Sequence, residues 1–144
     1  MAAITTEKPV PVINPRIGDF SFSVKASTTI LAGAAVGTDA SGYLVNVSGP
    51  SANNSAIKPQ GIAQVTVDNS AGASGAKLCR VQKAVFPFVN LTGDPVTIAN
   101  NNSTVYFEDN QTIRATDNGG TRCAAGTMRG FDAYGNVLVD MTLV

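Results

Sequence analysis

Apolar and polar residues alternate along much of the chain with a period of two. Phe20, Phe22 and Val24 fall on one face of an extended segment, and the serine and lysine residues next to them fall on the other. Such alternation is typical of a β-strand with one buried face. The same pattern predicts strands at residues 61–67, 77–82, 84–89, 96–98, 104–108 and 111–115. Short strands in close succession favour an all-β fold, a small β-barrel or β-sandwich.

The predicted strand at residues 84–89 has the sequence Ala-Val-Phe-Pro-Phe-Val. Phe86 and Phe88 share one face of this strand, so we expect both rings in the core or in a subunit interface. Pro87 points the other way and has no backbone N–H to donate. We therefore expect this strand at a sheet edge or at a bulge. Residues 27–37 carry a weak helical pattern, which their glycines disfavour.

Two short sequences predict β-hairpins. Asp39-Ala-Ser-Gly42 and Asp132-Ala-Tyr-Gly135 each precede an apolar run. Aspartate at the first position of a turn accepts hydrogen bonds from the following backbone, and glycine supplies the positive φ that closes the turn. Two unrelated hairpins with one favourable turn sequence explain the similarity better than an internal repeat does. Asp109-Asn110 predicts a third hairpin with a two-residue loop, because both residues tolerate positive φ.

The first 19 residues differ from the rest of the chain because prolines alternate with apolar residues. Each proline fixes its own φ and biases the preceding residue toward extended backbone. We interpret residues 1–19 as an extended N-terminal arm and residues 20–144 as a single β-domain. The apolar side chains favour a docked arm over an ordinary frayed terminus. The candidate partner-binding residues are Pro9, Val10, Pro11, Val12, Ile13, Pro15 and Ile17.

The charge of the chain argues against several partners. Charged residues make up 14% of the sequence, whereas about 25% is usual, and ten basic residues balance ten acidic ones. No basic run is present, so we expect no nucleic-acid partner. No apolar run of about 18 residues is present, so we expect no membrane partner. The N-terminus has no secretory leader pattern, so we expect synthesis in a cytoplasm.

The chain contains no histidine, which excludes Ser-His-Asp and Cys-His catalysis and histidine-based metal sites. Glu108, Asp109 and Asp117 form an acidic stretch, but their spacing does not match a calcium-binding loop. A pair of carboxyl groups facing across a cleft is not visible in a sequence. We interpret Asp109 and Asp117 as turn residues and Glu108 as a surface charge at a strand end. We therefore expect no catalytic residue, no metal, no cofactor and no enzymatic activity.

Cys79 and Cys123 are the two cysteines of the chain, and both lie in apolar, strand-like surroundings. Two widely separated cysteines do not form a disulfide framework. We interpret them as buried, reduced residues that act as small hydrophobic side chains. A disulfide between them is the alternative.

A series of short motifs is spread in order over residues 31–144. The motifs are Ala32-Gly-Ala-Ala-Val-Gly37 before Asp39-Ala-Ser-Gly42, Gly61-Ile-Ala63, Val85-Phe-Pro-Phe88, Val105-Tyr-Phe-Glu-Asp-Asn-Gln-Thr112, Gly119-Gly-Thr-Arg122 with Ala125-Gly126, and Val137-Leu-Val-Asp140. In this order they resemble the capsid cement, or head decoration, proteins of tailed bacteriophages. None of the motifs is catalytic, and the N-terminal arm is not part of the resemblance.

The resemblance implies a structural protein of the virion. Proteins of this family are β-rich subunits, often homotrimers, that lie on the outer surface of the bacteriophage head and bridge neighbouring capsomers. The implied partners are the major capsid protein and other copies of this chain. The implied location is the outer surface of the capsid, after synthesis in the host cytoplasm.

A second function remains open on the residues alone. Tyr43 and Tyr134 lie at predicted turns, and exposed aromatic residues on loops favour glycan recognition. The alternative is therefore a receptor- or glycan-binding module of a phage tail or an adhesin.

Overall fold

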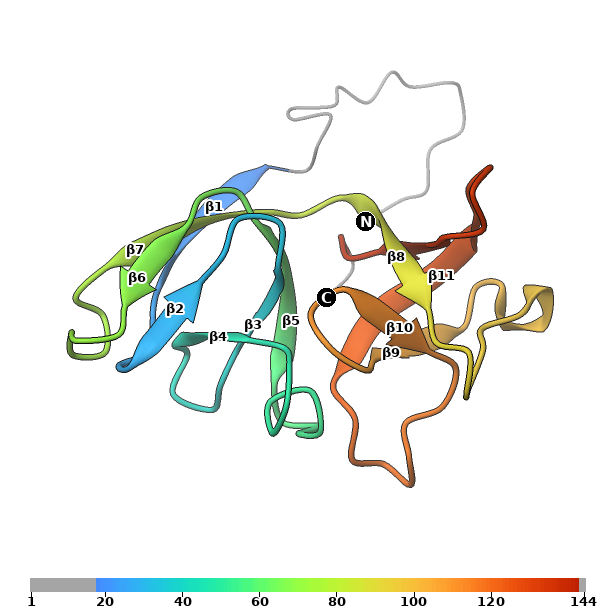
Figure 1. The fold of residues 1–144 in the computed structure, drawn as a ribbon, viewed down its shortest axis with the longest axis horizontal. Helices are drawn as coiled ribbons and strands as arrows, with labels where there is room; N and C mark the ends of the chain where they lie inside the picture. Colours follow the sequence, from blue (N-terminus) through green and yellow to red (C-terminus); the bar gives the residue numbers. More distant parts are fainter. Residues whose placement is uncertain (1–17, 143–144) are drawn as a thin grey trace, which may run out of the picture.

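The computed structural model describes residues 18–142, which fold into β-strands and one short 3₁₀ turn, with no α-helix among them (Figure 1). The all-β prediction is confirmed. No helix of the described part is long and apolar enough to cross a membrane. The strands are β1 (Asp19–Ser23), β2 (Thr28–Ile30), β3 (Ala35–Thr38), β4 (Leu44–Asn46), β5 (Lys58–Ala63), β6 (Val67–Asn69), β7 (Leu78–Gln82), β8 (Val85–Asn90), β9 (Thr104–Phe107), β10 (Thr112–Arg114), β11 (Ala124–Phe131) and β12 (Val137–Asp140); the 3₁₀ turn is η1 (Ile98–Asn100).

The N-terminal half forms a curled antiparallel sheet with the strand order β1-β7-β5-β3-β4. Its two outer strands approach each other, because Val24 forms a β-bridge with Leu44 just after β1 ends. The short pair β2-β6 packs beside this sheet (Figure 1). The enclosed core contains Val24, Ile30, Val36, Leu44, Ala63, Val67, Cys79 and Val81.

The C-terminal half forms a closed barrel with the strand order β10-β8-β12-β11-β9. All its strand pairs are antiparallel except β8 with β10. Phe88 and Phe107 meet inside it with ring centroids 5.7 Å apart in an edge-to-face arrangement, which is a favoured geometry for aromatic pairs. The open choice between barrel and sandwich is thus resolved in favour of a barrel for this half.

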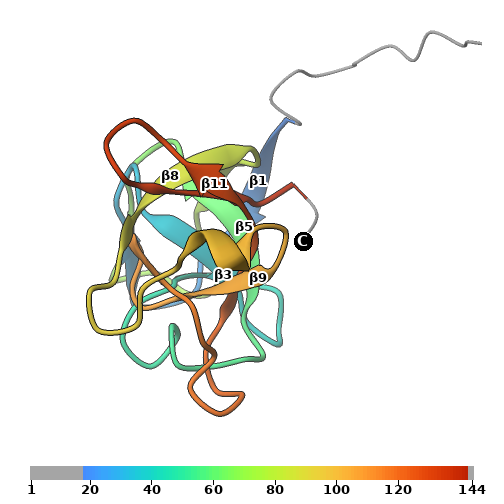
Figure 2. The ribbon, with the colours of Figure 1, turned by 90° about the vertical axis from the view of Figure 1, so that its right-hand side faces the viewer.

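The two halves form one continuous body. β7 and β8 follow each other along the chain with only two residues between them, and together they run across both halves (Figure 1). In the view from the barrel end, β8, β9 and β11 face the reader (Figure 2). Ala35 and Val45 of the first sheet pack into the same apolar cluster as the barrel interior. The backbone N–H of Ala35 also donates to the carbonyl oxygen of Asn110, at 3.0 Å. Shared apolar burial therefore holds the halves together.

The two Asp-Ala-x-Gly sequences form matching hairpin turns, as predicted. Asp39 Oδ1 accepts from the N–H groups of Ser41 and Tyr43, at 2.9 and 3.1 Å. Asp132 Oδ1 accepts from the corresponding N–H groups two and four residues later, both at 2.9 Å. Gly42 and the equivalent glycine of the second turn have φ of 87° and 82°. Local side-chain chemistry alone therefore specifies both turns.

Three sequence-based predictions of local structure are wrong. The predicted strand at 96–98 is replaced by η1, because Thr97 and Asn100 hydrogen-bond to each other and compete with a ladder. The predicted strand at 61–67 is two strands, β5 and β6, and the second of these extends two residues beyond the predicted end. The turn after β9 runs from Glu108 to Gln111, and neither Asp109 nor Asn110 adopts positive φ.

β5 begins earlier than predicted and carries a bulge next to Gly61. The register against β3 shifts between Val36 and Gly37, so Gln60 has no direct partner there. Gly61 has φ of 145°, and a Cβ at this position would overlap the carbonyl oxygen of Gln82 on β7. A glycine is therefore required where β5 and β7 approach most closely.

Both cysteines are buried and free. Cys79 lies in the core of the curled sheet and Cys123 lies in the barrel cluster. Because they belong to different cores, the alternative of a disulfide between them is wrong. The strand β1 begins at Asp19, one residue before the expected start of the β-domain.

Candidate functional site

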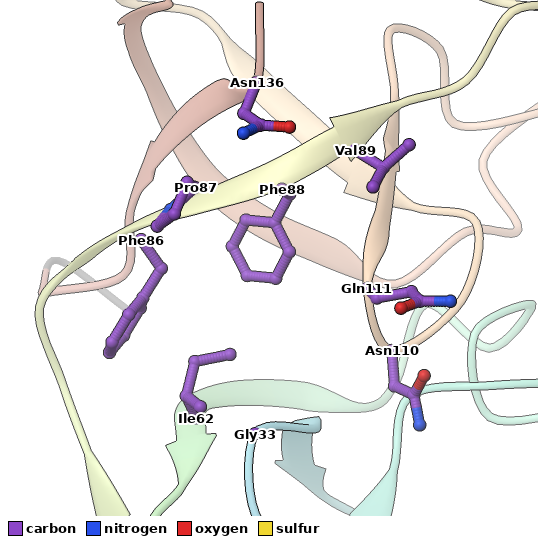
Figure 3. Close-up of a pocket in the computed structure, with 9 residues that line it drawn as sticks. All are labelled: Gly33, Ile62, Phe86, Pro87, Phe88, Val89, Asn110, Gln111 and Asn136. Carbon is purple, nitrogen blue, oxygen red and sulfur yellow. The ribbon is translucent and has the colours of Figure 1, made fainter. Parts of the chain in front are cut away.

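A cleft of about 410 Å³ lies between the two halves of the molecule, beneath β8 (Figure 3). Its apolar side is formed by Ile62 of β5 and by Phe86 and Phe88 of β8, and its other side carries amide groups. None of the described residues that line it is charged. The lining residues are Gly33, Ile62, Phe86, Pro87, Phe88, Val89, Asn110, Gln111 and Asn136. An apolar slot with amide groups at its rim suits an uncharged ligand with backbone-like hydrogen-bonding groups.

One edge of β8 is unpaired where it borders this cleft. β8 pairs with β12 from Val85 to Phe88, whereas β10 pairs with β8 only at Val89 and Asn90. The N–H of Val89 donates to the carbonyl oxygen of Gln111, so the backbone groups of Val89 point to the β10 side. Because these groups alternate along a strand, those of Val85 and Pro87 point the same way, to an edge with no strand partner among the described residues.

Pro87 limits the hydrogen bonds that this edge of β8 can form. A proline has no N–H, so at this position the edge offers only a carbonyl oxygen. Val85, two residues earlier, offers both an N–H and a carbonyl oxygen. The sequence-based expectation of an edge or a bulge at Pro87 matches the local geometry, although β8 belongs to a closed barrel.

An apolar row lies on the outer face of β8. Val85 and Val89 are 47% and 52% exposed, and Pro87 between them is also exposed. The half-buried Leu138 of β12 stands opposite Pro87 in the ladder. Exposed apolar residues that lie side by side mark candidate protein–protein contacts.

The acidic stretch 105–122 contains an ion-pair network. Glu108 lies 2.8 Å from Arg114 and 3.4 Å from Arg122, and Arg114 also contacts Asp94 at 3.1 Å. Glu108 lies directly after β9 with 31% of its side chain exposed, as expected of a surface charge at a strand end, and two guanidinium groups hold its carboxylate. Among residues 18–142, no group of three or more acidic or cysteine side chains is placed to hold a metal.

The two other carboxylates of this stretch lie in turns, as predicted. Asp109 Oδ1 accepts from the N–H of Gln111 at 2.9 Å. The carbonyl oxygen of Asp117 accepts from the N–H groups of Thr121 and Arg122, both at 2.9 Å.

Asp94 is the acceptor at the centre of a neighbouring network. Its Oδ2 accepts from the hydroxyl of Thr116 at 2.6 Å, from the backbone N–H of Thr116 and from Arg114. The hydroxyl of Thr116 is the main cause that lowers the pKa of Asp94, and Arg114 adds to it. These bonds tie the chain after β8 to the end of β10, so their function is structural.

The sequence-predicted site residues fall into two groups. Phe88 is 4% exposed and fills the barrel, whereas Phe86 is half-buried and faces the cleft (Figure 3). The arm residues Pro9, Val10, Pro11, Val12, Ile13, Pro15 and Ile17 lie outside the described residues.

The cleft itself is not visible in the sequence pattern. Gly33, Ile62 and Asn110 come from distant parts of the chain, and the folding of two halves against each other brings them together. One local signal is present, because Pro87 within an apolar run marks an incomplete ladder.

Comparison with known proteins gives no relative: no family model matches the chain, and no match is found among the curated proteins or the solved structures.

Proposed function

We propose that this protein is a capsid decoration, or cement, protein of a tailed bacteriophage. In this proposal it binds the outer surface of the shell formed by the major capsid protein, as a homotrimer, and stabilises the head. The observation that carries the proposal is the ordered series of motifs over residues 31–144. The chemistry is non-covalent, and the protein is not an enzyme.

The apolar row on β8 supports a contact of this kind. Val85, Pro87 and Val89 are exposed on one face of a strand that the barrel holds rigid. Burial of such a row contributes roughly 25 cal/mol per Å² of apolar surface removed from water. Many identical weak contacts on a lattice then add through multivalency. A homotrimer places equivalent surfaces at a threefold position of the shell.

Co-sedimentation with undecorated phage heads tests the proposal. We expect the wild-type protein to bind heads and to raise the temperature at which they release DNA. Val85→Asp places a charge in the apolar row and should weaken head binding by at least about tenfold. Ile98→Asp is the matched control, because Ile98 is an exposed apolar residue of η1 outside the row. A protein that does not sediment with heads at any concentration contradicts the proposal.

One observation favours the second candidate, a receptor- or glycan-binding module. Tyr134 is 91% exposed at the turn between β11 and β12, where its ring is available to stack on a sugar. Tyr43 is half-buried and less suited to this role. Fractionation of intact particles separates the two candidates, since a cement protein remains with DNA-filled heads and a receptor-binding module remains with tails.

A further inference from the structure

We infer that the cleft beneath β8 binds residues 9–15 of the N-terminal segment of a second copy of this chain, as a strand added to the free edge of β8. This exchange goes beyond the proposed function, because it links copies of the protein to each other with or without a shell. The sequence of the occupant is Pro-Val-Pro-Val-Ile-Asn-Pro. The inference combines the free edge of β8, the cleft and the hydrogen-bonding pattern of this segment.

The free edge of β8 requires donors from its partner. Val85 and Pro87 direct two carbonyl oxygens toward this edge, but only Val85 supplies an N–H. An added strand must therefore bring N–H groups two residues apart on one side.

The segment 9–15 supplies this pattern. In extended backbone, Val10 and Val12 direct their N–H groups to the same side. Pro9 and Pro11 direct only carbonyl oxygens to the opposite side, because they have no N–H. The segment therefore pairs through the side that Val10 and Val12 share, and the N–H groups of these two valines match the two carbonyl oxygens of the β8 edge.

The chemistry of the cleft matches the rest of the segment. Neither residues 9–15 nor the lining of the cleft contains a charged residue, so no ionised group loses water on docking. Phe86 and Ile62 form an apolar side against which valine and proline side chains pack. The amide groups of Asn110 and Gln111 lie at the rim, where they are placed to donate to proline carbonyl oxygens (Figure 3). Prolines also limit the entropy that the segment loses on docking.

The segment that occupies the cleft is more easily supplied by a second copy than by the chain that forms the cleft. β7 pairs with β1 along one edge and with β5 along the other, and the cleft lies on the β5 side, where Ile62 belongs to β5. The segment leaves the β1 side, where the N–H of Lys83 donates to the carbonyl oxygen of Gly18. To fill its own cleft it must cross over the β7-β8 strand from the β1 side. Six extended residues from Gly18 to Val12 span about 20 Å, which carries Val12 well beyond the end of β1.

If copies exchange this segment, removal of backbone N–H groups from its pairing side should weaken self-association of the full-length protein in solution. Val10→Pro/Val12→Pro removes the two N–H groups that pair with Val85 and Pro87 and keeps the segment apolar. We expect its dissociation constant for self-association, measured by sedimentation velocity, to rise at least about tenfold. Ile13→Pro is the matched control, because it removes an N–H from the opposite side and should leave the constant unchanged. Equal effects of the two variants, or a monomeric wild-type protein at high concentration, overturn the inference.

Complementation tests whether the occupant comes from a second copy. Val89→Trp places a large side chain at the cleft but leaves the N-terminal segment intact. Mixed with the Val10→Pro/Val12→Pro variant, which keeps an open cleft, it should form a heterodimer that neither variant forms alone. Absence of this heterodimer, while the wild-type protein associates, overturns exchange between copies. Because the assay contains no phage heads, its failure leaves the proposed function intact, and failed head binding leaves the exchange intact.

Discussion

Single aspartates hold several turns and strand ends of this protein through hydrogen bonds to their carboxylates. Asp94 and Asp132 each accept from a neighbouring side chain and from backbone N–H groups. The hydroxyl of Thr116 is the largest cause that lowers the pKa of Asp94, and the amide of Asn136 is the largest for Asp132. Carboxylates with a lowered pKa link the stability of the fold to pH.

The direction of this link follows from the lowered values. An aspartate in an unfolded chain has a pKa near 3.9, so above about pH 5 these groups are ionised in both states and their contribution is complete. As the pH falls through the lower pKa of the folded state, protonation removes the hydrogen bonds and the contribution is lost. We expect the free energy of unfolding to be nearly constant from pH 7 to 5 and to fall below about pH 4, as urea titrations can measure.

Asp94→Asn isolates one of these contributions. The amide removes the charge that Arg114 and Thr116 contact, so we expect a loss of about 1 kcal/mol in the free energy of unfolding at pH 7. The variant should also show a shallower fall in stability below pH 4. Asp117→Asn is the control, because the backbone carbonyl of Asp117 closes its turn. An Asp94 variant with an unchanged acid profile contradicts this assignment.

The two cysteines should not react with thiol reagents in the folded protein. Burial raises the pKa of the Cys123 thiol to about 12 and also raises that of Cys79. Since the thiolate is the reactive form, a thiol reagent at pH 7 should label neither residue until the protein unfolds. Joint replacement of Cys79 and Cys123 by alanine should leave head binding unchanged. Loss of binding with an intact fold would show that a thiol takes part in the contact.

At the scale of elements, β8 combines a buried face with a partly unpaired edge and an exposed apolar face. Phe88 packs on Phe107 inside the barrel, so Phe88→Ala should lower the free energy of unfolding by about 3–5 kcal/mol. Val89→Ala, one residue further on the exposed face, should change it by less than about 0.5 kcal/mol. Urea unfolding of both variants checks the contrast. A Phe88 variant as stable as the Val89 variant contradicts the packing.

The sequence predicts those elements whose cause is local. The hairpins at Asp39 and Asp132 are predicted because each turn is closed by its own aspartate and glycine. The strand at 96–98 is mispredicted, since Thr97 and Asn100 bond to each other and form η1 in place of a ladder. Period two does not reveal where β5 ends, because its partner β7 and the bulge at Gly61 decide this.

The candidate site is predicted less well than the fold, because it depends on contacts between distant parts of the chain. Phe86 and Pro87 stand out in the sequence, whereas Ile62 and Asn110 acquire their place only when the two halves pack together. The ion pairs of Glu108 with Arg114 and Arg122 are not predicted, because these residues meet only after β9 and β10 pair. Long-range pairing therefore hides both the cleft and the ion-pair network from a local pattern.

For the whole molecule, the balance of charges predicts how shell binding responds to salt. The ten basic and ten acidic residues cancel, and no basic run is present. Counterion release and long-range steering should therefore be small. The affinity for undecorated heads should change by less than about tenfold, or roughly 1.4 kcal/mol, between low and high salt. A steeper dependence in a salt titration would show that ion pairs dominate the contact.

Removal of residues 2–17 tests the arm as a contact of the whole molecule with the shell. Deletion stops before Gly18, because the carbonyl oxygen of Gly18 accepts from the N–H of Lys83. Among residues 18–142 the two cores consist of residues from Val24 onward, so the melting temperature should change by only a few degrees. Head binding should fall at least about tenfold, because the arm supplies apolar anchors and prolines reduce its ordering cost.

A length-matched variant separates the contribution of the prolines from that of the apolar side chains. The triple variant Pro9→Gly/Pro11→Gly/Pro15→Gly keeps Val10, Val12 and Ile13 but makes the backbone flexible. Its affinity for heads should therefore lie between the affinities of the wild-type protein and of the deletion variant. Both variants are measured at concentrations where the protein is monomeric, so that exchange between copies does not contribute. If the deletion unfolds the β-domain, the arm belongs to the fold. If it leaves both stability and head binding unchanged, the shell contact lies elsewhere, and the apolar row on β8 becomes the surface to test.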